Sequence, residues 1–294
     1  MAKGRLNGSS APIKGITCMI GGAALLTAND AVIKWLTADY PVGQIMFLRG
    51  IFVLAPISFL IWHAGGVHRL QTRQPLLHLL RAALVICGTF LFVTGLRFLP
   101  LAEAIAIAFA GPLFITALAQ PLLGESIGWR RWMAVFAGFC GVLIICQPGG
   151  AVFQWVALLT LAASLTGAFR DILTRKMAAE ETSEAQLTFT SLGVTMGGLA
   201  TIFITDWQPV AMRDWALFAL DGLLIGGAHF LMIETFRYAE AGLVAPFKYS
   251  SVVWAALFGY FVFGDLPDQS TMIGGAVVIA SGMYILHRER KRRC

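Results

Sequence analysis

The chain has 294 residues, of which 57% are hydrophobic and 13% are charged, and its mean hydropathy is +0.74. An ordinary soluble domain carries about 25% charged residues, so this composition excludes that class of protein. The formal net charge is +6, but the basic residues lie between apolar runs rather than along one folded surface, so we expect no nucleic-acid partner.

Long apolar runs follow one another along almost the whole chain. A helix that crosses a bilayer core about 30 Å thick needs about 20 apolar residues, and the runs lack the alternation typical of barrel strands. The first run continues past the length of a signal-peptide core, so we expect it to remain as a helix. We predict an all-α integral membrane protein with ten transmembrane helices near residues 12–36, 42–63, 77–97, 101–122, 130–147, 151–175, 185–205, 214–237, 242–263 and 270–287.

The distribution of Lys and Arg between these runs predicts the orientation in the membrane. When the N-terminus is placed in the cytoplasm, sixteen of the 22 basic residues fall on that side, three fall on the other side and three lie within spans. Cytoplasmic loops carry an excess of Lys and Arg. Both ends of the chain are therefore expected in the cytoplasm, which agrees with an even number of spans.

The two halves of the chain resemble each other. When the sequence is shifted against itself, 88–100 aligns with 228–240, and a shift longer by one position places Asp30 on Asp171. Each copy holds five spans, and an odd number makes the second copy enter the membrane from the opposite side, as in the inverted repeats of secondary transporters. The predicted organisation is an N-terminal cytoplasmic tail over 1–11, a first repeat over 12–147, a second repeat over 151–287 and a basic cytoplasmic tail over 288–294.

Three motifs in this duplicated frame carry a family resemblance. They are P-V-G-Q-I-M-F-L-R over 41–49, G-P-L-F-I-T-A-L-A-Q-P-L-L-G-E-S-I over 111–127, and F-G-D-L-P over 263–267, where Asp replaces the more usual Glu. With these motifs the chain resembles the drug/metabolite transporter superfamily, in its ten-helix form with two EamA domains. It is most similar there to bacterial exporters of amino acids, above all aromatic ones.

This resemblance implies both an architecture and a location. Spans 1 to 4 and 6 to 9 are expected to form a central cavity, while spans 5 and 10 lie at the periphery. The protein is expected to cross the bilayer of a bacterial inner membrane several times.

Two charged residues lie at membrane depth near the predicted outer side. Charges in hydrocarbon are costly, so those that are retained usually face a partner or a water-filled cavity. Asp30 in the first span and Arg49 in the second lie at similar depths of about 9 to 10 Å at 1.5 Å per residue. They form either a fixed ion pair between two helices or a site that recognises the two charges of an amino acid.

A second group of charges occupies comparable depth on the predicted inner side. Arg170 and Asp171 lie in span 6, Glu234 lies in span 8 and Lys248 lies in span 9. The four charges form either a cytoplasmic gate or a structural network. Lys248 is the best single candidate for contact with a ligand, because the family resemblance places span 9 on the cavity and the matched residue in the first repeat is the neutral Ala108.

Further candidates lie near the middle of spans 8 and 9. His229 either binds substrate or a proton or is a packing histidine. Ser251 and Trp254 flank the face of Lys248, and Trp254 faces either the cavity or lipid. Phe47, Phe90 and Phe109, together with Tyr249 at the position matched to Phe109, form either an apolar wall for a flat side chain or ordinary helix packing.

These features predict a secondary transporter that exports amino acids with aromatic or hydrophobic side chains, or related metabolites, by alternating access. The chain has no G-x-x-x-x-G-K-[ST] loop for ATP and no H-E-x-x-H or G-x-S-x-G motif, so we expect no ATP, enzymatic activity, cofactor or metal. The main alternative is export of drugs or other cationic compounds, which suit aromatic walls and carboxylates equally well. A carrier for phosphorylated metabolites would need more basic residues at depth. Coupling to protons stays open.

Overall fold

In the computed structural model, every regular element of the described residues is helical, and no strand occurs among them. The described residues are 11–63, 65–123, 128–147, 155–177, 181–238 and 244–293. The helices are α1 (Ala11–Leu36), α2 (Val42–His63), α3 (Pro75–Phe98), α4 (Leu101–Ala108), α5 (Gly111–Leu123), α6 (Trp129–Cys146), α7 (Val156–Met177), α8 (Ser183–Ala200), α9 (Asp214–Tyr238), α11 (Ser250–Phe258) and α12 (Gln269–Arg293). The 3-10 helices are η1 (Val67–Leu70), η2 (Thr201–Phe203) and η3 (Ala245–Tyr249), and η4 (Gly259–Phe263) is a π-helix.

Seven of the segments are long and apolar enough to cross a membrane: α1, α2, α3, α6, most of α7 and α9, and the stretch Leu101–Leu118 through α4 and α5. Phe247–Phe263 and Gln269–Ile285 are shorter apolar helices. The more polar α8 packs along α2 and α3 and completes the set. The fold is therefore an all-α membrane protein with ten transmembrane helices, as predicted. Helix α12 continues through 288–293, where we expected a tail, and almost all of the predicted tail over 1–11 lies outside the described residues.

Two matching spans each depart from a regular α-helix. Proline has no N–H to donate and its ring clashes with the carbonyl four residues earlier, and α4 ends at Ala108, four residues before Pro112. Ala110 N donates to Ile107 O at 2.9 Å, which makes a tight turn before α5 begins. In the second half the matching span contains the 3-10 turn η3, which includes Pro246 and lies directly before α11.

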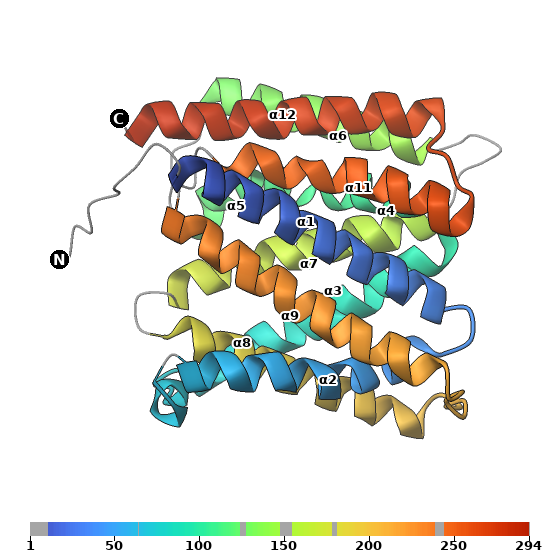
Figure 1. Ribbon diagram of the computed structural model, residues 1–294. Helices are drawn as coiled ribbons and strands as arrows, with labels where there is room; N and C mark the ends of the chain where they lie inside the picture. The colour runs from blue at the N-terminus through green and yellow to red at the C-terminus, as the bar shows by residue number, and fades with distance from the viewer. Residues whose placement is uncertain are drawn as a thin grey trace.

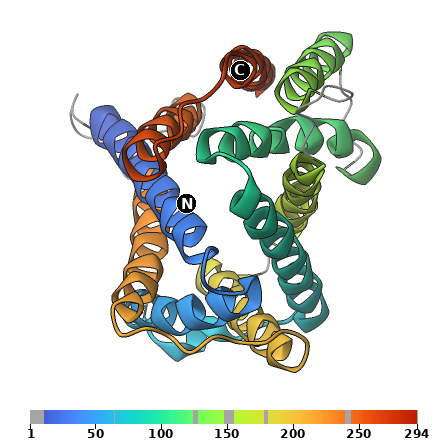
Figure 2. The same ribbon diagram turned by 90° about the vertical axis from the view of Figure 1, so that its right-hand side faces the viewer.

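The packing of the helices follows the internal duplication. The repeat matches α1 with α7 and α9 with α3, and the extensive contact between α1 and α9 has its equivalent in the contact between α3 and α7. The matched helices α2 and α8 pack on each other, and so do α6 and α12. Figures 1 and 2 show the resulting bundle. The first residue of α1 and the last of α12 lie at one end of it, which we call the terminal end.

Helices α6 and α12 form a pair at the edge of the bundle, as the resemblance implied (Figure 2). Their backbones cross closely at two glycines. A Cβ atom on Gly274 would lie 2.5 Å from the carbonyl oxygen of Gly141, and one on Gly141 would lie 2.8 Å from that of Gly274. Only glycine fits this crossing, which brings two apolar spans together in lipid without a hydrophobic driving force.

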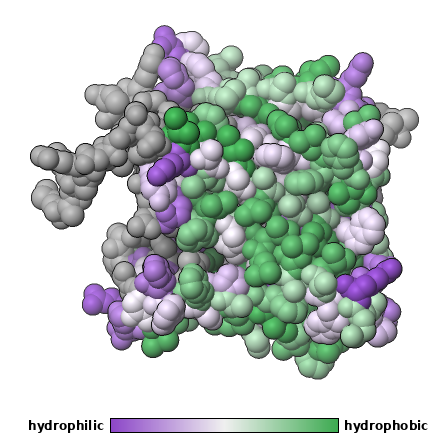
Figure 3. Space-filling model, in the orientation of Figure 1, coloured by the Kyte–Doolittle hydropathy of each residue, from purple (hydrophilic) through white to green (hydrophobic). Residues whose placement is uncertain are grey.

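The outer surface is suited to lipid. One face is apolar across its middle, with hydrophilic side chains gathered towards the two ends of the helices (Figure 3). Large apolar side chains such as Phe136, Leu223 and Phe261 are exposed. Exposed apolar area on this scale is typical of a surface that contacts membrane rather than water.

Candidate substrate site

Three charged residues from three helices lie at one depth, in the half of the bundle away from the terminal end. Asp30 lies six residues before the end of α1, and Arg49 and Asp221 each lie seven residues after the starts of α2 and α9. At 1.5 Å per residue these positions are about 9 to 10 Å inside the helix ends. The charge of Arg49 acts on both carboxylates. We call Asp30, Arg49 and Asp221 the acidic cluster.

Asp221 is held by its neighbour on α1. The side-chain amide of Asn29 donates to Oδ1 of Asp221 and, at 3.2 Å, to the backbone carbonyl oxygen of the same residue. The side chain of Asp221 is 0% exposed, and within the described ranges its Oδ2 has no hydrogen-bond partner. Sequence reasoning did not single out Asp221, although a carboxylate seven residues inside an apolar span is the same signal that identified Asp30.

Asp30 and Arg49 are both half-buried. No hydrogen bond or salt bridge joins their side chains in the described part of the chain. They lie close enough for their charges to interact without satisfying each other's hydrogen-bonding groups. The acidic cluster therefore holds one carboxyl group and one guanidinium group that remain able to bind a ligand.

A second cluster lies towards the terminal end. On α7, the Arg170 guanidinium binds the Asp171 carboxylate, with Nη2 at 2.7 Å and Nε at 2.8 Å from Oδ1. Both side chains are partly exposed, at 39% and 46%. The side chain of Lys248 in η3 is exposed and feels the charges of both residues, but in the described ranges it makes no salt bridge of its own.

Arg81, on α3, belongs to the same region. Its Nε donates to Thr174 Oγ1 on α7 at 2.8 Å, and its Nη1 donates to the carbonyl oxygen of Gln186 on α8 at 2.8 Å and to Thr190 Oγ1. Arg81 thus joins three helices. We call Arg81, Arg170, Asp171 and Lys248 the basic cluster.

The two clusters occupy positions related by the internal repeat. The shift that matches Asp30 with Asp171 also matches Asn29 with Arg170, and the shift that aligns 88–100 with 228–240 matches Arg81 with Asp221. At the last of these positions one half of the molecule has a guanidinium and the other half a carboxylate. The inverted repeat therefore gives the protein two opposite sites, one acidic and one basic.

His229 lies on α9 between the clusters. Its Nδ1 is 2.8 Å from the carbonyl oxygen of Ile225, so we assign the proton to Nδ1, and Nε2 has no partner among the described residues. The guanidinium groups of Arg49 from one cluster and of Arg81 and Arg170 from the other all act on the ring. Glu234 lies half-buried on the same helix.

The remaining predicted side chains differ in their access to a ligand. Ser251 is buried and its hydroxyl donates to Lys248 O at 2.7 Å. Trp254 is half-buried and lies near Phe258, with ring centroids 6.3 Å apart. The Nε1 of Trp254 is buried and lacks a hydrogen-bond acceptor within the described residues.

The aromatic residues lie at different depths. Phe109 and Tyr249 are both buried and pack on each other with ring centroids 4.7 Å apart, so the two repeat-related rings meet at the interrupted spans. Phe47 on α2 packs on Trp207, which lies between η2 and α9, with ring centroids 5.4 Å apart. Phe90 is half-buried on α3.

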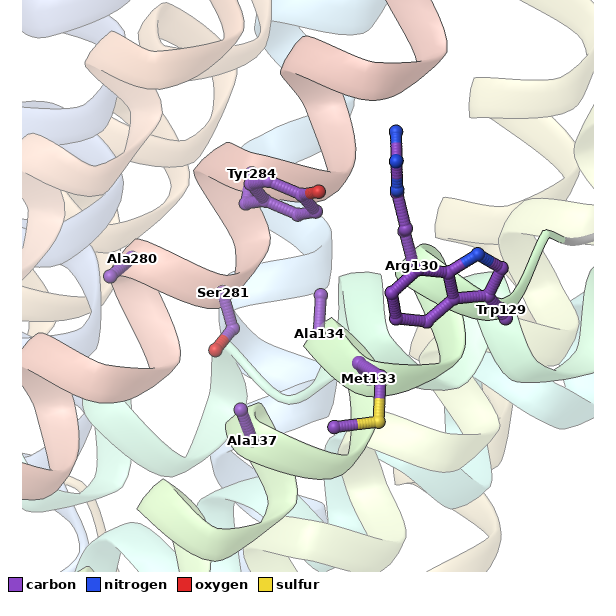
Figure 4. Close-up of a pocket in the computed structure, with 8 residues that line it drawn as sticks. All are labelled: Trp129, Arg130, Met133, Ala134, Ala137, Ala280, Ser281 and Tyr284. Atoms are coloured by element: carbon purple, nitrogen blue, oxygen red, sulfur yellow. The ribbon is translucent and has the colours of Figure 1, made fainter.

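A groove of about 510 Å³ lies between α6 and α12, away from both clusters (Figure 4). It is lined by Trp129, Arg130, Met133, Ala134, Ala137, Ala280, Ser281 and Tyr284. Three of the eight lining residues are alanine, and Arg130 is the one charged residue among them. Because this helix pair is peripheral, the groove opens towards lipid, and we do not assign it to the substrate.

Hydrogen bonds at repeat-related positions hold both ends of the bundle. Away from the termini, Tyr40 donates from its hydroxyl to Asp214 Oδ2 at 2.7 Å, which fixes the start of α9. The shift that matches Asp30 with Asp171 matches Tyr40 with Glu181, which is buried at the terminal end. The Oε1 of Glu181 accepts from the backbone N–H groups of Arg73 at 2.8 Å and Gln74 at 3.1 Å, which fixes the start of α3.

Glu181 is expected to make the stability of the protein sensitive to acid. Burial alone would raise the pKa of this carboxyl, but hydrogen bonds from His78, Arg73 and Thr72 outweigh it and hold the pKa below the ordinary 4.5. Its stabilisation is therefore complete above pH 4.5 and is lost as the pH falls through the lower folded-state pKa. We expect Glu181→Gln to cost about 1.5 to 3 kcal/mol at neutral pH and less in acid, as measured by thermal unfolding in detergent.

The matched control is Glu184→Gln, which changes a nearby carboxyl for which no bond to the start of α3 is seen. It should leave the pH dependence of unfolding as in the wild type. A difference in stability between wild type and Glu181→Gln that stayed constant down to acid pH would contradict the assignment.

Comparison with known proteins adds names to this architecture. The chain is 29% identical to the S-adenosylmethionine uptake transporter of Rickettsia prowazekii, over 95% of this chain and 94% of that protein. It is also 29% identical to the riboflavin transporter of Rhizobium johnstonii, over 97% and 94%. It is 22% identical to the pseudopaline exporter CntI of Pseudomonas aeruginosa, over 91% and 94%. These names do not support the narrower resemblance to aromatic amino-acid exporters, and they differ in substrate and direction.

The fold is also found in a solved crystal structure, with a TM-score of 0.64 at 19% identity over 95% of this chain and 97% of that chain. The description of the EamA-like transporter family matches this chain twice, at residues 13–147 and 154–286. The two matches fall one on each half of the ten-helix bundle. The protein therefore belongs to the EamA-like transporter family, within the drug/metabolite transporter superfamily.

Proposed function

We propose that this protein is a secondary transporter for a metabolite that carries an α-amino-acid group and a flat ring. The observation that carries the proposal is the unsatisfied pair of Asp30 and Arg49 at one depth in the bundle. A carboxylate binds an ammonium group, and a guanidinium binds a carboxylate with two parallel hydrogen bonds. The pair thus has the complement of both charges of an amino acid.

Other residues in the interior of the bundle contact the flat ring of the substrate and take part in the transport cycle. His229, which feels charges from both clusters, faces the part of the substrate beyond its amino-acid end. Lys248 and the basic cluster contact the substrate as it passes towards the terminal end. The two inverted halves then rock to open one side at a time, as in other transporters with inverted repeats. The excess of Lys and Arg supports a cytoplasmic position for the terminal end.

Among candidate substrates, S-adenosylmethionine is supported by the names of relatives that match nearly the whole chain. It combines an amino-acid end with an adenine ring. Phenylalanine, which represents the aromatic amino acids expected from the sequence, has the same two parts. Riboflavin, named for other relatives, has a flat ring but no amino-acid group. Export or uptake then follows the direction of the gradients.

Exchange of labelled compounds across reconstituted vesicles tests the substrate class. We expect saturable exchange of S-adenosylmethionine or phenylalanine, and inhibition of S-adenosylmethionine exchange by methionine. 5′-Methylthioadenosine is the matched control, because it keeps the adenosine part and lacks the amino-acid group, and it should inhibit much less. Exchange of riboflavin or of the flat cation ethidium, with none of either amino-acid compound, would contradict the proposal and favour the alternative substrates.

A further inference from the structure

Asp221 is the buried charged group that substrate recognition by Asp30 and Arg49 leaves unexplained. Its side chain is 0% exposed, and Asn29 satisfies Oδ1 only. In the described part of the structure Oδ2 has no donor. An ionised carboxylate without a full set of partners is very costly in such surroundings, whereas a protonated carboxyl is not. The geometry around Oδ2 is therefore that of a place for a proton.

The charged groups around Asp221 come from the two helices that pack on α9. Helix α1 contributes Asp30 and the neutral Asn29, and α2 contributes Arg49. Arg49 is shared, because its positive charge acts on both carboxylates. Asp30 is half-buried whereas Asp221 is fully buried. The substrate's ammonium group therefore meets Asp30, and Asp221 lies behind the binding pair.

We infer that Oδ2 of Asp221 binds a proton that crosses the membrane together with the substrate, so that this protein is a proton-coupled symporter. The inference rests on the proposed binding of an amino-acid group by Asp30 and Arg49. It adds a coupling ion and the residue that carries it.

The coupling follows from the shared arginine. In the empty site the positive charge of Arg49 acts on both Asp30 and Asp221. When the carboxylate of the substrate binds Arg49, it neutralises that charge, and Asp221 loses its electrostatic support and takes up a proton from water on the open side. By thermodynamic linkage, the proton in turn favours binding of the substrate. After the bundle opens to the other side, the substrate leaves, Arg49 is free again, and Oδ2 releases the proton.

Vesicles that contain the purified protein test the coupling, with S-adenosylmethionine and phenylalanine as the probes. In the wild type, a pH gradient that is acidic on the side of the labelled probe should drive its accumulation above the external concentration. Asp221→Asn keeps the acceptor for Asn29 but not the ionisable oxygen. It should abolish accumulation driven by the pH gradient, while exchange of labelled for unlabelled probe continues at a rate within a few-fold of the wild type.

Asp206→Asn is the matched control, because Asp206 is exposed between η2 and α9. It should accumulate the probe as the wild type does. Accumulation that ignores the pH gradient in the wild type, or that persists in Asp221→Asn, would overturn the inference. Loss of exchange as well as accumulation would also count against it, because Asp221 would then be needed for binding itself.

Infrared spectroscopy gives a test that needs no transport. At neutral pH, binding of S-adenosylmethionine or phenylalanine to detergent-solubilised protein should increase the C=O band of a protonated carboxyl, and Asp221→Asn should lack this change. A spectrum in which binding produces no such band would overturn the inference. If neither probe binds or is transported, the proposed substrate class is wrong. In that case the pH dependence of the same C=O band tests the coupling. A carboxyl that titrates in the wild type should be absent from Asp221→Asn.

Discussion

Replacing Arg49 by glutamine is expected to abolish transport while the protein still folds and inserts. Arg49 provides the cation for the carboxylate of the substrate, and no salt bridge ties it to Asp30 in the described ranges. Truncating one partner of a buried charge pair typically costs about 2 to 5 kcal/mol, which corresponds to roughly a 30-fold or greater loss of affinity. The measurement is the concentration dependence of S-adenosylmethionine exchange in vesicles.

Two further variants define what the loss means. Arg97→Gln makes the same change at an exposed position at the end of α3 and should exchange substrate normally. Arg49→Lys retains the charge without the planar pair of donors, so it should recover only part of the affinity. Normal exchange by Arg49→Gln in folded, inserted protein would remove Arg49 from the site.

Replacing Lys248 by methionine is expected to give the second-largest effect, a loss of transport of at least about tenfold with no loss of stability. A lysine inside a span costs about 2.5 to 3.5 kcal/mol on insertion scales, and among the described residues no carboxylate pairs directly with this one. Its charge is therefore not needed for the fold. Methionine keeps the length of the side chain, so the variant removes the charge with little change in packing.

The thermal midpoint in detergent and the rate of exchange in vesicles must be measured on the same preparation. Lys176→Met, at an exposed position near the terminal end of α7, is the matched control and should leave exchange unchanged. A Lys248→Met protein that is markedly less stable than the wild type would show that the lysine has a structural role. Unchanged transport would show that it does not contact the substrate.

The fold was largely predictable from the sequence, because every segment that crosses the hydrocarbon of the bilayer must be a long apolar helix. The long apolar runs, the prolines in two matching spans (Pro112 and Pro246) and the alternation of basic loops are all visible in the sequence alone. The internal duplication then placed matched helices on opposite sides of a two-fold arrangement, and the structure has the corresponding contacts between α1 and α9 and between α3 and α7. The repeat was visible because polar residues such as Asp30 and Asp171 interrupt otherwise similar apolar stretches.

The site was predictable only in part. Asp30 and Arg49 stand out because a charge in an apolar span is rare, and Asp221 obeys the same rule. The role of Asp221, however, depends on its contact with Asn29. The two residues lie far apart in the chain, so no local sequence pattern predicts this contact. Arg81 had the same difficulty, since its partners Thr174 and Thr190 come from two other helices.

The substrate is less predictable than the site, because one fold and one pair of charges serve several ligands. Relatives that are equally similar to this chain are named for S-adenosylmethionine and for riboflavin. These ligands share a flat ring, which any of several aromatic side chains binds. S-adenosylmethionine has an amino-acid group and riboflavin does not. The pair of Asp30 and Arg49 is the feature of this chain that we expect to bind that group.

A structure of the protein with S-adenosylmethionine or phenylalanine bound would show where the amino-acid group binds. We expect the carboxylate of the ligand to lie within hydrogen-bond distance of the Arg49 guanidinium and its ammonium group to lie against Asp30. A ligand bound without contact to Arg49, for example in the groove between α6 and α12, would contradict this expectation.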